Sequence, residues 1–199
     1  MFKPMRTLLA LATALLPCAA IAQAAPTDAA AEVADVANNT PFGNWLVTCE
    51  ALSVKRSVCR LTQELTLRDS GDLVVRFIAL PAKGGAIMLA QVPSGVYLPG
   101  GAVWRASTPE DAKQHEMIWQ RCLGGVCEAA QGLSDADLAE MTASGTMLFG
   151  YRMDPQGEPL VLEVDVKRFA EGIEALRVQM DEAELAVIPA PDADAKPKN

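Results

Sequence analysis

The chain has 199 residues, of which 17 are basic and 25 are acidic, so its formal net charge is −8 at pH 7. Nucleic acid and anionic lipid are both repelled by net negative charge, and no cluster of lysine or arginine offsets it here. The composition therefore excludes the usual pattern of a nucleic-acid-binding protein, and we expect no nucleic-acid partner.

Residues 1–24 have the pattern of a signal peptide for export. Lys3 and Arg6 supply the positive start, an apolar run covers residues 8–20, and small residues follow up to Ala24. The apolar run is shorter than the roughly 20 residues that a membrane-spanning helix needs. We expect cleavage after Ala24, with cleavage two residues earlier as the alternative, and no stable membrane insertion afterwards.

The cysteine pattern indicates an oxidising compartment. One of the five cysteines, Cys18, lies within the signal peptide. The residues before it faintly resemble a lipid-attachment site, so a lipoprotein is the alternative to a soluble exported protein. The other four form close pairs, Cys49 with Cys59 and Cys122 with Cys127. An exported chain with paired cysteines is typical of a disulfide-stabilised fold. We expect both disulfides to be made by the periplasmic machinery, and the protein to be periplasmic, associated with the outer membrane or extracellular.

The spacing of these cysteines favours disulfides over metal binding. A Cys49–Cys59 bridge closes an 11-residue loop and a Cys122–Cys127 bridge a six-residue loop. The chain-entropy relation gives stabilisations of about 2.8 and about 2.2 kcal/mol. A four-cysteine zinc site usually has two C-x-x-C pairs, which this sequence lacks. We expect neither a metal nor a cofactor.

The chain divides into a leader, one domain and a tail after the signal peptide. Residues 25–40 are rich in alanine and show no apolar periodicity, so we expect a flexible leader. Residues 41–188 are long enough for one domain with a sizeable core. In residues 189–199 no apolar residue is larger than alanine, which predicts a disordered tail.

The domain reads mainly as short strands separated by turn residues. Residues 58–68 alternate between polar and apolar side chains, and the turn at residues 69–72 joins them to a hairpin partner. This density of strands predicts a mainly β fold, an antiparallel β-sandwich. The expected strands are residues 45–50, 58–68, 73–80, 86–92, 103–106, 117–122, 126–130, 146–153 and 160–166.

Two short helices interrupt the strands. Ser134 is a suitable N-cap for the first, Asp137 stands where a capping-box acid would, and Gly145 ends the helix. The second starts near Arg168 and carries one apolar stripe, which we expect to pack on the sheet of the same domain. That stripe consists of Phe169, Ile173, Leu176 and Met180.

The sequence shows no set of residues that reads as a catalytic centre, and we expect no enzyme. His115 is the single histidine, and the polar run of residues 110–116 around it predicts a solvated loop position. No G-x-S-x-G motif accompanies it. A periplasmic hydrolase that uses His115 or a pair of carboxylates remains the alternative.

The Pro/Gly-rich loop at residues 93–101 is the candidate interaction loop. Val96, Tyr97 and Leu98 lie at its centre, and we expect Tyr97 to be displayed on the surface. The alternative is that the loop is only a structural crossover between two strands.

Five short segments together carry a family resemblance. They are residues 42–49, 59–63, 92–101, 122–127 and 169–176. In this order, around the two cysteine pairs, they resemble the invasion-associated locus B family of exported bacterial proteins. The chain departs from that family at three positions: Asn44 replaces the usual aspartate, Ser94 a larger apolar residue, and Arg168 a glycine.

The resemblance implies an immunoglobulin-like β-sandwich in the periplasm or at the outer membrane. It brings no catalytic residues, so it favours a non-enzymatic binding module whose partner is an unknown envelope or host protein. The founding member of the family is linked to host-cell invasion, which implies a role in host-cell interaction. A structural or assembly factor for envelope complexes is the other alternative.

Overall fold

The computed structural model describes residues 36–54 and 56–180. The predicted signal peptide, the predicted tail and most of the leader lie outside these residues. The elements are β1 (Pro41–Phe42), β2 (Trp45–Ser53), β3 (Arg56–Thr66), β4 (Leu73–Ala82), β5 (Gly85–Pro93), η1 (Leu98–Gly100), β6 (Ala102–Ala106), β7 (His115–Leu123), β8 (Val126–Ser134), α1 (Asp135–Ser144), β9 (Thr146–Tyr151), β10 (Leu160–Asp165) and α2 (Phe169–Gln179).

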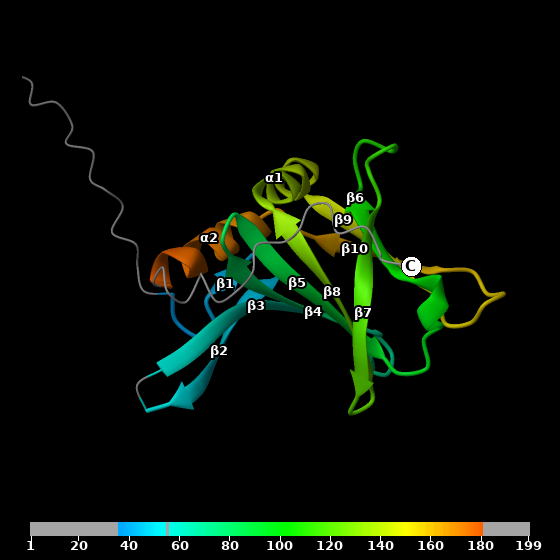
Figure 1. The fold of residues 1–199 in the computed structure, drawn as a ribbon, viewed down its shortest axis with the longest axis horizontal. Coiled ribbons are helices and arrows are strands. Elements are labelled where there is room, and N and C mark those ends of the chain that lie inside the picture. The colour runs from blue at the N-terminus through cyan, green and yellow to red at the C-terminus, as the bar shows by residue number, and fades with distance from the viewer. Residues whose placement is uncertain (1–35, 55, 181–199) are drawn as a thin grey trace, which may run out of the picture. The chain divides into compact units, whose positions relative to one another are not determined.

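The strands form one antiparallel sheet in the order β1-β2-β3-β4-β5-β8-β7-β6-β9-β10. Strand β7 has two partners (Figure 1). Its residues 115–117 pair with β6, whereas residues 118–123 lie beside β8. The sheet therefore turns at β7, and β6, β9 and β10 form its second half. The predicted mainly β, antiparallel fold with two short helices is confirmed.

The two halves of the sheet face each other across the core. Phe77 on β4 meets Phe149 on β9 edge to face, with 5.1 Å between the ring centroids. The hydroxyl of Tyr151 on β9 donates a hydrogen bond to the backbone carbonyl of Val74 on β4. Such contacts between two sheet layers are compatible with the predicted sandwich.

Helix α1 begins and ends where its sequence signals predict. The side chain of Ser134 accepts a hydrogen bond from the backbone amide of Asp137, and the Asp137 carboxylate accepts one from the amide of Ser134. Gly145 follows the helix with a φ of 70°, a conformation that glycine adopts without steric strain. Leu138 and Met141 are buried and hold α1 on the core.

Helix α2 packs its apolar stripe into the same core. Phe169, Ile173 and Leu176 are buried, while Met180 follows the end of the helix and is half-buried. Phe169 stacks at an angle on Trp45 of β2 with 4.5 Å between the centroids. Neither helix in the described ranges is long and apolar enough to cross a membrane.

Several strands are longer than the sequence predicted. Strand β2 continues to Ser53, and β8 continues to Ser134, directly before α1. Strand β7 begins at His115, inside the run that was expected to be a loop. These extensions are paired with neighbouring strands, so tertiary pairing fixes their bounds more than local sequence does.

Candidate functional site

The two cysteine pairs lie opposite each other on neighbouring strands. Cys49 on β2 is bonded to Cys59 on β3, and Cys122 on β7 is bonded to Cys127 on β8. These are the pairs expected from the sequence. Two disulfides indicate a compartment more oxidising than the cytoplasm.

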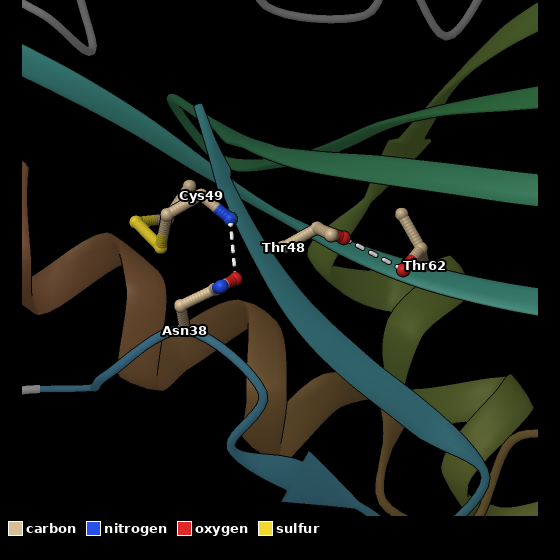
Figure 2. The surroundings of a disulfide bond; sticks show 5 residues. Asn38, Thr48, Cys49 and Thr62 are labelled. Atoms are coloured by element: carbon tan, nitrogen blue, oxygen red, sulfur yellow. Dashed lines mark hydrogen bonds between the residues drawn. A yellow bond between two sulfur atoms is a disulfide. The ribbon is translucent and has the colours of Figure 1, made fainter. Parts of the chain in front are cut away.

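Residues 36–40, which the sequence assigned to the leader, are hydrogen-bonded to β2. The side-chain oxygen of Asn38 accepts a bond from the backbone amide of Cys49 at 2.9 Å (Figure 2). The backbone amide of Asn39 donates to the carbonyl of Val47, and the amide of Val47 donates to Thr40. These bonds hold the segment along the strand that carries the first disulfide.

The candidate interaction loop is less exposed than the sequence suggested. Val96 is half-buried and packs against the core. Tyr97 is also half-buried, so its side chain is only partly exposed, and its backbone amide donates to the carbonyl of Arg152. Leu98, at the start of η1, is 42% exposed. The loop therefore presents one large apolar side chain, because its centre is tied to the domain.

A row of small and apolar side chains crosses the outer face of the first half of the sheet. Pairing register places its members directly opposite one another on six successive strands. The inner residues of the row are half-buried, and the large side chains at its ends are exposed, 45% for Leu46 and 60% for Ile118. The row, called the outer row below, is Leu46, Thr62, Ile78, Leu89, Ala130 and Ile118.

A polar network lies beside the outer row, two residues further along the strands. Arg76 donates hydrogen bonds to Glu64 and to Gln91, and Gln91 donates to Glu128 at 2.8 Å. Arg121 lies 3.6 Å from the same Glu128 carboxylate. Each arginine in this network is therefore paired with an acid on a neighbouring strand.

Three central members of the outer row, Thr62, Ile78 and Leu89, line a groove of about 480 Å³ together with the network. Its lining combines the apolar residues Ile78, Leu80 and Leu89 with the polar residues of the network. The buried residues of α1 and α2 belong to the core cluster on the other face of the sheet. Within the described residues, the helices thus leave the groove uncovered.

His115 occupies a different position from the one the sequence suggested. It is 8% exposed, so the expectation of a solvated loop histidine is wrong. Its ring stacks on Trp104 of β6, with 4.2 Å between centroids and 8° between planes. Burial lowers the pKa of His115 below its usual value, although Asp137 acts in the opposite direction.

Three potential ligand groups meet at this histidine. The donor atoms of His115, Asp137 and Glu140 all lie within 4.8 Å of one another. Strand β7 contributes the imidazole, and α1 contributes the two carboxylates from positions three residues apart, on the same side of the helix. No local sequence pattern indicates this cluster, because the helix and the strand are distant along the chain.

A second hollow gathers carboxylates. Glu64 on β3 and Glu163 and Asp165 on β10 line a pocket of about 580 Å³. Gln63, 8% exposed, lies at its wall, and its side-chain oxygen has no hydrogen-bond partner among the described residues. This pocket and the cluster at His115 are two places in the described residues where carboxylates gather, as the alternative of a carboxylate-pair hydrolase requires.

Comparison with known proteins identifies a sequence family and a similar solved structure. Residues 45–177 match the sequence model of the family described as "Invasion associated locus B (IalB) protein". No curated protein matches the sequence. The chain resembles the crystal structure of invasion associated protein B from Bartonella henselae, with a TM-score of 0.60 and 17% identity over 70% of this chain and 95% of that chain. At this identity the structural likeness supports the fold alone.

Proposed function

The chain belongs to the invasion associated locus B family, and on this basis we propose that it is an exported, non-enzymatic binding module of the bacterial envelope. The signal-peptide pattern at residues 1–24 and the two disulfides support export to an oxidising compartment. The outer row is the single observation that carries the binding role. Six strands align small and apolar side chains on a face of the sheet that the two described helices leave uncovered.

The proposed occupant of the groove is a protein of the bacterial envelope. Arg60, Arg76 and Arg121 line the groove with the acids Glu64 and Glu128, so charges of both signs are present there. Each of the three arginines is paired with an acid on a neighbouring strand. The whole chain, by contrast, has a net charge of −8. A partner with apolar side chains between charges of both signs complements such a surface, whereas a polyanion does not.

The disulfides support binding by making the surface rigid. They clamp β2 to β3 and β7 to β8, the outermost strand pairs of the six that carry the outer row. A surface that is ordered before binding loses less conformational entropy when the partner docks. The disulfides therefore stabilise the fold and also prepare the groove.

The proposal is tested by placing a charge on the outer row. The tagged mature protein is used to capture proteins from a bacterial envelope extract, and the bound proteins are quantified by mass spectrometry. Ile118→Lys should reduce the captured partner by about tenfold or more, because a lysine would be desolvated in the interface. Val161→Lys on β10 is the matched control, since Val161 is 56% exposed and Ile118 60%.

Two other outcomes separate the alternatives. If Leu98→Lys abolishes capture and Ile118→Lys does not, the interaction surface is the loop at residues 93–101 and the groove proposal is wrong. If a host-cell extract supplies a partner that depends on Ile118, the surface is supported but the envelope source is contradicted.

A further inference from the structure

We propose that His115, Asp137 and Glu140 form a binding site for a divalent metal ion of the zinc class. The site lies where the start of β7 meets the first turns of α1, on the opposite face of β7 from the exposed Ile118. It involves neither the groove nor the cysteines, so it does not depend on the proposed binding function.

The first observation in favour of a metal site is the environment of the His115 side chain. Its Nε2 atom is fully buried and has no hydrogen-bond partner among the described residues. The nearest carboxylate oxygen, Oδ1 of Asp137, lies 3.9 Å away, beyond hydrogen-bonding distance. A buried polar atom without a partner is unfavourable, and such atoms in folded proteins often mark an ion or a water. Nε2 is therefore available to coordinate an ion.

The carboxylate of Asp137 is held in place by the helix cap. Its Oδ2 atom accepts hydrogen bonds from the backbone amide and the hydroxyl of Ser134, both at 2.7 Å. Oδ1, the other oxygen, is the one nearest to His115. A ligand carboxylate fixed in this way by an outer hydrogen bond is common at metal sites.

Glu140 supplies the third donor atom, and its side chain can make most of the movement that brings the three donors to coordination distance. It is half-buried, and its carboxylate lies within 4.8 Å of the other two donors. Tetrahedral zinc with ligands at about 2.0–2.1 Å would bring the donor atoms to roughly 3.3 Å from one another. Rotation of the Glu140 side chain, which has three torsions, can close much of this gap without moving the backbone.

The chemistry of the three donors selects the ion. One imidazole nitrogen and two carboxylate oxygens suit zinc or a similar first-row divalent ion, whereas calcium and magnesium prefer oxygen ligands alone. The ion would neutralise two carboxylates and would join β7 to α1. Three protein ligands leave a coordination position for water or for a group from a partner.

The test uses the full mature protein without a histidine tag, first freed of metal by a chelator. Titration with Zn²⁺ should give one bound ion per chain and a higher melting temperature, because an ion that binds only the folded state stabilises it. Co²⁺ should give the visible absorption of a four-coordinate nitrogen–oxygen site. Mn²⁺ and Ca²⁺ serve as comparison ions and should bind more weakly.

Three variants locate the site. His115→Gln and Glu140→Gln should each weaken Zn²⁺ binding by at least about tenfold and abolish the cobalt spectrum. Glu116→Gln is the control, because it also removes one carboxylate charge. Glu116 follows His115 in sequence but is exposed on the opposite face of β7, so this variant should change neither Zn²⁺ binding nor the cobalt spectrum. Because Glu140 is not in the core, its variant stays informative even if the His115 variant folds poorly. No zinc binding, or binding that Glu140→Gln leaves unchanged, would overturn the proposal.

Discussion

At the scale of single residues, His115 shows what the sequence could and could not predict. The polar run around it suggested a solvated position, yet in β7 His115 and Met117 are buried whereas Glu116 and Ile118 are exposed. This alternation is visible in the sequence once the strand is started two residues earlier. The stacking on Trp104 is not visible, because it depends on the pairing of β6 with β7.

The disulfides give a prediction at the residue scale. Replacing both Cys122 and Cys127 by alanine should lower the free energy of unfolding by about 2.2 kcal/mol, and the same change at Cys49 and Cys59 by about 2.8 kcal/mol. Urea unfolding monitored by fluorescence, with intact mass to verify the disulfide state, measures both. The contribution proposed for each disulfide is wrong if the corresponding double variant unfolds at the wild-type urea concentration.

At the scale of elements, helix α2 shows how closely one helix approaches the sheet. The sequence predicted its apolar stripe, but not the need for glycine at Gly172, in the first turn of the helix. A Cβ atom at Gly172 would lie 2.7 Å from Cδ1 of Leu61 and 3.1 Å from Cγ of Phe42. Leu61 is fully buried, so it has little room to move aside.

The close approach of α2 to the sheet predicts whether one substitution raises or lowers the stability of the protein. Gly172→Ala gains about 1 kcal/mol in helix propensity, but overpacking of a core costs about 1–3 kcal/mol. We expect a net loss of about 1 kcal/mol in stability, measured by thermal or urea unfolding. Val178→Ala, at an exposed position of the same helix, is the control and should change stability little. A Gly172→Ala variant more stable than the wild type would show that α2 packs less closely than described.

At the scale of the whole molecule, local patterns predicted the elements and the hairpin across residues 69–72, but not the pairing of strands that are distant in sequence. Alternation in residues 58–68, the turn at 69–72 and the Ser134 cap each act over a few residues, so they are readable from sequence. Strand β5 pairs with β8, although β6 and β7 lie between them in the sequence. Strand β7 pairs with β8 and with β6, and so joins the two halves of the sheet. Both depend on contacts distant in sequence, which no local pattern encodes.

The same limit explains why the outer row was not predicted. The sequence gives the side of each strand on which Ile78 or Leu89 lies, because side chains alternate in a strand. It does not give the register between strands, and a shift of one residue would move every apolar side chain to the other face. The candidate loop at Val96–Leu98 was found instead, because proline and glycine mark it locally.

The claim that the outer row binds an envelope protein is tested most directly by photo-cross-linking in living cells. A photoreactive amino acid replaces Ile118 in the outer row and, in separate strains, Val161 on β10 and Leu98 in the loop. All three positions are exposed, so each tolerates the substitution and reports only what lies beside it. We predict a cross-linked envelope protein at position 118 and none at 161 or 98. A cross-link at 161 or 98 with none at 118 would contradict the account.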